Sequence, residues 1–225
     1  MYSELKSFVK QVPCIEAFLR WYRYVIHGKD YRSYVGGKWD EIGKLQFDFL
    51  VSQGLESSHI LLDIGCGSLR GGRFFIEYLD KGHYLGIDHN RWLIRTGLIK
   101  ELPVGLKSTK KPEFVISSKF EFNKFSVQPD YALALSLFTH LSQDHILLCL
   151  SNLRKFIKTN GRFFATFNDI KNSPNYINPH RSGDSSHFEY AIDEMTQMGN
   201  DEGWKTKYLG DWGHPRNQQM IEYFL

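Results

Sequence analysis

From residue 59 to residue 168 the chain alternates short apolar runs with longer amphipathic stretches. The apolar runs predict buried parallel strands, and they lie at 59–64, 84–88, 112–117, 131–138 and 161–168. Between them, apolar residues recur every three or four positions, which predicts helices over 70–79, 90–101 and 142–157. Asn90 and Ser142 are suitable N-caps for the last two. This alternation predicts an α/β sheet with helices on both faces.

The flanking segments predict further elements. Apolar positions between Ile15 and Ile26 predict an amphipathic helix on the edge of the domain, and a second helix is expected over 40–53 after the break at Gly36 and Gly37. Residues 169–186 are polar and contain two prolines, which indicates either a lid or a surface loop. A helix is expected over 188–202. Strands at 204–209 and 220–225 should pair antiparallel, because the connection between them is too short for a helical crossover.

Composition narrows the function classes. With 225 residues, 42% hydrophobic and 24% charged, the chain is typical of one globular domain. We expect a single domain over 1–225, with 1–54 as a helical lid or edge and 55–225 as the core. The net charge of +3 comes from scattered residues, which gives no support for a nucleic-acid partner.

The sequence also indicates where the protein is located and whether it contains disulfides. Three widely spaced cysteines disfavour a disulfide framework and a zinc site. No apolar run approaches the roughly 20 residues of a membrane span, and the first residues lack a signal-peptide pattern. We therefore expect a cytoplasmic protein without a membrane partner or a bound metal.

A glycine-rich turn follows the first strand and opens the first helix, with the sequence Leu-Asp-Ile-Gly-Cys-Gly-Ser-Leu-Arg-Gly-Gly over 62–72. Glycine at Gly65 and Gly67 lets a ligand approach the backbone, and the helix N-terminus favours an anionic group. The spacing Gly-x-Gly-x-x-x-Gly differs from the dinucleotide fingerprint. Asp63, just before the turn, would repel a diphosphate but attract an ammonium group. The ligand predicted is therefore S-adenosylmethionine rather than NAD.

Asp88 ends the second strand, 21 residues after Gly67. A carboxylate at this place can accept hydrogen bonds from both hydroxyls of a ribose. The alternative is a surface acid that caps the next helix. The turn upstream favours the ribose role.

With these motifs the chain resembles class I S-adenosylmethionine-dependent methyltransferases, and most closely a bacterial-type subgroup. The similarity spans residues 34–225 and rests on the segment 61–73 and on Asp-Trp-x-His-Pro-Arg-x-Gln over 211–218. It implies a Rossmann-like, doubly wound, mostly parallel seven-stranded sheet with an antiparallel last strand and N-terminal helices.

The resemblance also implies the cofactor contacts. The methionine part would lie on the turn, the ribose on Asp88, the adenine near the segment after the third strand, and the sulfonium at the end of the fourth. Lys119 stands where similar proteins often have an acid. The residues implied are Gln46, Asp63, Gly65, Cys66, Gly67, Arg70, Asp88, His89, Phe120, Leu135 and Ser136.

Methyl transfer is an in-line displacement, so it needs alignment, and a base only where the acceptor must lose a proton. His140, after the fourth strand, is the first candidate for that base, and His214 is the second. Each has a structural alternative, as a helix-capping or a turn-stabilising histidine. Arg73 or Arg216 would suit an anionic acceptor, although a structural role is the simpler interpretation for both.

Two other groups of residues could suggest a nucleophile or a metal site, and we expect neither. Cys66 lacks a neighbouring base in the sequence and is interpreted as a small packing residue. His187, Glu189, Asp193 and Glu194 lack a second histidine in register, so a solvated helix face is preferred to a metal site.

The function predicted is methyl transfer from S-adenosylmethionine, with O-methylation of a small-molecule or glycan-like acceptor. Two alternatives stay open: an NAD-dependent oxidoreductase on a related sheet, and a non-catalytic S-adenosylmethionine-binding module.

Overall fold

The computed structural model describes residues 31–225. The helix predicted between Ile15 and Ile26 lies outside the described residues. The chain divides into two compact units, residues 1–38 and residues 39–225. The first unit contributes the short helix α3 (Tyr31–Tyr34), and the second contains every other element described below. The expected domain limits, 1–225 with a boundary near residue 54, stay a prediction.

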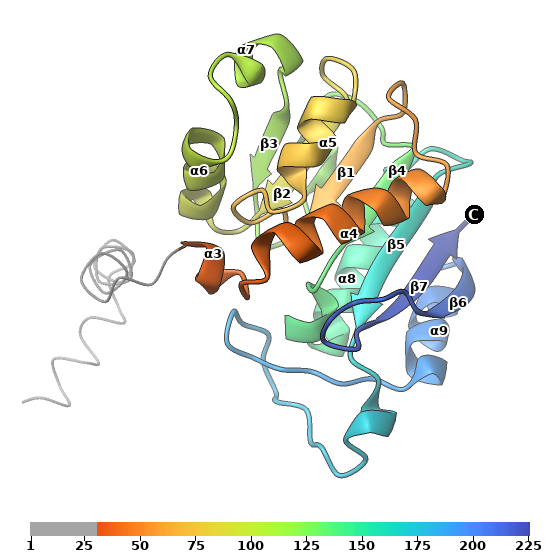
Figure 1. The fold of residues 1–225 in the computed structure, drawn as a ribbon. Helices are drawn as coiled ribbons and strands as arrows, with labels where there is room; N and C mark the ends of the chain where they lie inside the picture. Colours follow the sequence, from red (N-terminus) through yellow and green to blue (C-terminus); the bar gives the residue numbers. More distant parts are fainter. Residues whose placement is uncertain (1–30) are drawn as a thin grey trace, which may run out of the picture. The chain divides into compact units, whose positions relative to one another are not determined.

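The second unit is built on a seven-stranded sheet with the order β3-β2-β1-β4-β5-β7-β6 (Figure 1). Strands β1 to β5 are parallel, whereas β7 runs antiparallel to both of its neighbours, β5 and β6. This confirms the predicted mostly parallel sheet with an antiparallel last strand. The strands are β1 (Leu61–Ile64), β2 (Tyr84–Asp88), β3 (Glu113–Ile116), β4 (Tyr131–Ala134), β5 (Arg162–Phe167), β6 (Lys205–Asp211) and β7 (Gln219–Phe224).

Helices cover both faces of this sheet. On one face pack α4 (Trp39–Ser52), α5 (Gly72–Tyr78) and α6 (Arg91–Lys100), and on the other α8 (Gln143–Arg154) and α9 (Ile192–Asp201). Side chains alternate along β5, so that Phe164 contacts the first group and Phe163 the second. Shorter helices are α7 (Leu106–Lys110), η1 (Phe122–Lys124), η2 (Phe138–His140) and η3 (Ile170–Asn172). No helix within residues 31–225 has the length and apolar character that a membrane span requires.

Most elements begin and end within two residues of the prediction. The side chain of Asn90 caps α6, as predicted, by accepting hydrogen bonds from two amides of its first turn. Ser142 does precede α8, but its hydroxyl makes no cap and instead accepts a hydrogen bond from the hydroxyl of Ser182. The strand expected over 131–138 ends at Ala134, because Ser136 has a positive φ of 54° and the chain then enters η2.

The helix predicted over 188–202 begins only at Ile192. Residues 188–190 are extended and lie beside residues 168–170, where Asp169 and Tyr190 form a parallel bridge. Hydrogen bonds close this contact from both sides, from the amide of Tyr190 to the carbonyl of Asn168 and from the amide of Ile170 to the carbonyl of Tyr190. The loop between them therefore leaves and returns at the same edge of the sheet.

Candidate functional site

The glycine-rich turn lies at the carboxyl end of β1. The amides of Gly65 and Cys66 both donate to the carbonyl of Ile87 in β2, at 2.8 and 3.1 Å. Gly65 and Gly67 have φ values of 76° and 52°, a left-handed conformation that favours glycine. The thiol of Cys66 is buried, and burial raises its pKa, which agrees with a packing role and not with that of a nucleophile.

Helix α4 packs closely on the start of α5. Gln46 is buried there, and a Cβ atom added at Gly71 would lie only 2.0 Å from its Nε2 atom. A Cβ atom at Gly43 would likewise lie 2.5 Å from the carbonyl oxygen of Arg70. The absence of side chains at these two glycines therefore allows α4 to carry Gln46 onto the turn.

Asp63 is buried beside this turn. Its carboxylate accepts a hydrogen bond of 2.7 Å from the hydroxyl of Tyr84 in β2. Burial, opposed by the hydrogen bond from Tyr84 and assisted by the charge of Asp88, raises the pKa of Asp63 to about 6. Asp63 is therefore ionised at neutral pH and becomes neutral in mildly acidic solution.

Asp88 lies at the end of β2 and accepts a hydrogen bond from the glycine-rich turn. One carboxylate oxygen accepts the amide of Gly67 at 2.9 Å, and the other accepts the amide of Asn90 at 2.7 Å. Burial raises its pKa, whereas those amides and His89 lower it. His89 lies 3.5 Å from Asp88 and reaches Asp184, in the loop after β5, at 3.1 Å.

Two arginines, Arg70 and Arg216, interact electrostatically at this edge of the sheet. Arg70 is buried, and burial together with the nearby charge of Arg216 lowers its pKa to about 10, while Asp63 opposes the shift. Arg216 therefore lies close enough to the turn to act on Arg70 electrostatically, although it belongs to the connection between β6 and β7. Arg73 instead pairs with Asp40 and stacks on Phe74, which supports a structural role.

A hydrogen-bond network joins the ends of β4, β5 and β7. The hydroxyl of Ser136 donates to the amide oxygen of Gln218 at 2.9 Å, and the hydroxyl of Thr166 donates to the same oxygen at 3.0 Å. The backbone amide of Ser136 donates to Thr166 Oγ1 at 2.7 Å. This network fixes the left-handed backbone of Ser136, next to the buried Leu135.

His140 ends η2 and contacts the loop after β5. Its Nδ1 atom hydrogen-bonds to the carbonyl oxygen of Ser186, and its own carbonyl accepts the amide of Gly183. A carbonyl oxygen can only accept a hydrogen bond, so Nδ1 carries the proton, and in the neutral ring Nε2 is the acceptor. The loop therefore sets the tautomer of His140.

His214 is buried in the connection between β6 and β7. Its ring stacks on Trp212, with ring centroids 5.4 Å apart, and its Nδ1 atom accepts a hydrogen bond from the backbone amide of Arg216. The neutral ring consequently carries its proton on Nε2. These contacts agree with the turn-stabilising alternative.

Phe120 has a left-handed backbone and a buried ring. The ring packs beside Phe122 in the core on the α8 face, with centroids 6.1 Å apart, and the amide of Asn152 donates to its carbonyl. The predicted contact of Phe120 with an adenine stays a prediction, as do the other expected cofactor contacts.

Sequence reasoning missed one pocket at this edge of the sheet. It has a volume of about 220 Å³. The residues that line it are Asn168, Asp169, Asn172, His187, Glu189, Arg216 and Asn217. The solvated helix face predicted for Glu189 is wrong, because Glu189 precedes α9 and is only 6% exposed. The apolar residues at positions 188 and 190, spaced by two, were a signal for an extended segment.

Within residues 31–225 no group of three metal-ligating side chains is arranged to hold an ion.

Comparison with known proteins shows which fold this chain has. No family model matches this sequence. Magnesium protoporphyrin IX methyltransferase from Synechocystis PCC 6803, solved with bound S-adenosylmethionine, matches with a TM-score of 0.61, 15% identity, and coverage of 92% of this chain and 95% of that one.

Two other structures match comparably. An S-adenosylmethionine-dependent methyltransferase from Clostridium acetobutylicum gives a TM-score of 0.58 at 13% identity, covering 93% of this chain and 97% of that one. The glycopeptide N-methyltransferase MtfA gives 0.63 at 10% identity, covering 81% and 90%. These identities are low, so the similarity establishes the fold: a Rossmann-like sheet of the class I methyltransferase type.

Proposed function

We propose that this chain is an S-adenosylmethionine-dependent methyltransferase that methylates a hydroxyl group of a small-molecule or glycan-like acceptor. One observation carries the proposal: the glycine-rich turn after β1 has Asp63 just before it and the carboxylate of Asp88 at the amide of Gly67. Carboxylates at these two places suit a ligand with an ammonium group and a ribose, and Asp63 disfavours a diphosphate.

The residues around the turn fit such a cofactor. Asp63 offers a carboxylate for the ammonium group, and Arg70, close to it, offers a guanidinium for the carboxylate of the same amino-acid head. Asp88 would take the ribose hydroxyls, with His89 beside it. The turn leaves little room for a side chain at Gly65, since an added Cβ atom would lie 3.1 Å from Leu137. The other cofactor contacts proposed are Gly67, Cys66, Gln46, Phe120, Leu135 and Ser136.

When bound, S-adenosylmethionine supplies an electrophilic methyl group. The chain must then orient an acceptor and remove its proton. His140 is the better of the two candidate bases, because its Nε2 atom has a lone pair when Nδ1 donates to Ser186. In His214 the hydrogen bond from Arg216 leaves Nε2 protonated, so that atom is a donor.

The antiparallel β7 counts against the oxidoreductase alternative. Dinucleotide-binding sheets of the classic type have the strand order 3-2-1-4-5-6, whereas here β7 is inserted between β5 and β6 with the opposite direction. The non-catalytic alternative keeps the same cofactor site and differs only in turnover.

Isothermal titration separates these functions. We expect S-adenosylmethionine and S-adenosylhomocysteine to bind with dissociation constants of tens of micromolar or tighter, about −6 kcal/mol, and NAD to give no binding heat. Binding of NAD without binding of S-adenosylmethionine would overturn the proposal. Transfer of a labelled methyl group to any acceptor of a hydroxyl-bearing panel would exclude the non-catalytic module.

A further inference from the structure

The pocket beside Glu189 is built from three separate segments. Asn168 and Asp169 come directly after β5, Glu189 returns from the loop, and Asn217 belongs to the connection between β6 and β7. All three segments meet at the carboxyl edge of the sheet, where doubly wound folds bind ligands. The connection that forms one wall also carries Arg216, which acts on Arg70 at the glycine-rich turn.

The carboxylate of Glu189 is buried, and only one of its two oxygens has a hydrogen-bond partner within residues 31–225. Its Oε1 atom lies 2.9 Å from His187 Nε2. Its Oε2 atom is buried, and no donor within residues 31–225 hydrogen-bonds to it. A buried acceptor without a donor costs folding free energy, and such a cost is tolerated where a ligand supplies the donor.

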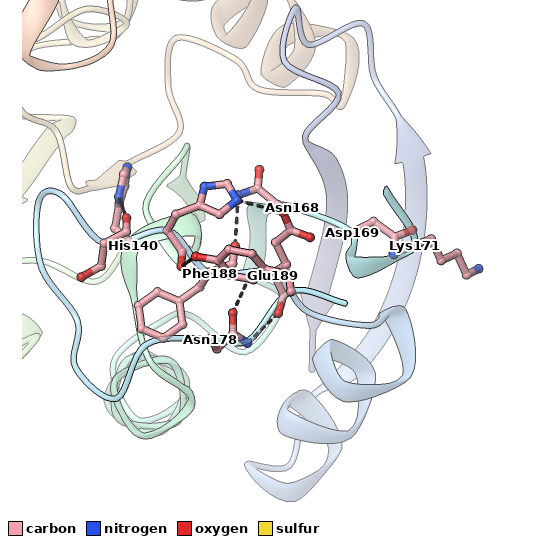
Figure 2. Close-up of polar contacts among 10 residues, drawn as sticks. His140, Asn168, Asp169, Lys171, Asn178, Phe188 and Glu189 are labelled. Atoms are coloured by element: carbon pink, nitrogen blue, oxygen red, sulfur yellow. Dashed lines mark hydrogen bonds and ion pairs between the residues drawn. The ribbon is translucent and has the colours of Figure 1, made fainter. Parts of the chain in front are cut away.

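The backbone of Glu189 is held firmly. Its amide donates to the side-chain oxygen of Asn178 at 2.8 Å, and its carbonyl accepts the side-chain amide of Asn178 at 2.7 Å (Figure 2). The side chain of Asn168 donates to the carbonyl of Phe188 at 3.0 Å. Phe188 and Tyr190 are buried with their rings stacked, which anchors the segment on both sides of Glu189. The carboxylate therefore sits on a rigid support, as a binding group requires.

The lining residues indicate which chemical class of acceptor the pocket can bind. Three side-chain amides and the carboxylate of Asp169 offer both donors and acceptors, and the only ring among the lining residues is the imidazole of His187. A planar aromatic acceptor binds best between apolar side chains, and this pocket is lined by polar and charged ones. A cation would meet Arg216, and an anion would meet Asp169 and Glu189. The volume of about 220 Å³ is smaller than that of pockets for drug-sized ligands, roughly 300–1,000 Å³, so it suits one ring-sized group.

We infer that this pocket is the methyl-acceptor subsite, that it takes a neutral, saturated sugar ring, and that the carboxylate of Glu189 accepts a hydrogen bond from one of its hydroxyls. This inference rests on the proposed function. It makes Glu189 a residue that binds and selects the acceptor. His140 keeps the role of base.

The test uses the full chain loaded with S-adenosylhomocysteine and a set of defined probes. The neutral probes are the methyl glycosides of glucose, mannose and rhamnose; glucosamine, glucuronate and catechol represent the cationic, anionic and aromatic classes. Binding is followed by saturation-transfer NMR titration. We expect at least one neutral glycoside to bind with a dissociation constant of roughly 1–10 mM.

Variants then assign the binding to the pocket. Glu189→Gln removes the charge and keeps the shape, and we expect it to weaken the glycoside about tenfold while titration with S-adenosylhomocysteine is unchanged. Glu77→Gln, an exposed glutamate on α5, is the matched control and should bind like the unaltered chain. Should Glu189→Gln fail to fold, Asn172→Ala, at an exposed position on the rim, is expected to weaken the same glycoside several-fold.

Three outcomes overturn the inference: no saturable binding of any neutral glycoside, preferential binding of a charged or aromatic probe, or equal glycoside affinity in Glu189→Gln and the unaltered chain. Failure of S-adenosylhomocysteine to bind at all would instead refute the proposed function. The two failures are therefore distinguishable in one set of titrations.

Discussion

Asp88 provides the sharpest test of the cofactor site. Its two carboxylate oxygens accept the amides of Gly67 and Asn90, at 2.9 and 2.7 Å. An ionised carboxylate has about four lone-pair sites, so each oxygen can accept one further hydrogen bond. The two hydroxyls of a ribose would occupy these remaining sites. Asp88→Ala should therefore lower the affinity for S-adenosylmethionine even under conditions in which the variant is fully folded.

The magnitude follows from the hydrogen bonds. Bonds to a charged group contribute about 1.5–3 kcal/mol each, so losing two of them is expected to cost about 3 kcal/mol or more, roughly 150-fold in the dissociation constant. The amides of Gly67 and Asn90 also lose their acceptor, which should lower the free energy of unfolding by about 1–3 kcal/mol. Asp88→Asn keeps the shape and one acceptor oxygen, and its affinity should be intermediate.

The assay is isothermal titration at a temperature at which each variant is folded by circular dichroism. Asp80→Ala, at an exposed aspartate just ahead of β2, is the matched control and should bind with unchanged affinity. A folded Asp88→Ala protein that binds S-adenosylmethionine within about threefold of the unaltered chain, far less than the 150-fold expected, would remove Asp88 from the ribose.

Three further predictions concern the turn and the base. Because a Cβ atom at Gly71 would lie 2.0 Å from Gln46 Nε2, Gly71→Ala should lower the free energy of unfolding by about 1–3 kcal/mol; denaturant titration should find this loss reduced when Gln46 is also alanine, and equal losses in both backgrounds would speak against the close contact. Asp63, with a pKa of about 6, loses its charge as the pH falls, so affinity for S-adenosylmethionine should drop about tenfold by pH 5, and Asp63→Asn should abolish that dependence; a parallel drop in the variant would contradict the assignment. His140→Ala should abolish methyl transfer while cofactor titration stays unchanged, and full turnover in this variant would end its candidacy as the base.

The sheet was predictable because its strands are buried on both faces. Strand β2 (Tyr84–Asp88) has the predicted bounds, because it is covered by helices on either side and its only charged residue, Asp88, stands at its carboxyl end. The cap of α6 was equally predictable, because Asn90 acts on amides two and three residues away. Local chemistry of this kind is written in short stretches of sequence.

The surroundings of Glu189 could not be predicted in the same way. Helical spacing continues backwards from α9, but Phe188 and Tyr190 are held extended by residues 168–170, some 20 positions earlier. Likewise, the tautomer of His140 is set by Ser186, 46 residues away. Such contacts depend on where the loop returns to the sheet, and no local pattern records that position.

The loop after β5 connects parts of the site that the sequence separates. Asp184 reaches His89, which lies beside Asp88 on the ribose side of the proposed site. Ser186 fixes the ring of His140, and the extended segment that follows carries Glu189 into the pocket. Because one short run of backbone carries all three contacts, displacing it would disturb cofactor, base and acceptor together. Substitutions in 182–189 should therefore alter methyl transfer even where their side chains touch neither ligand, a dependence that a merely variable surface loop would not have.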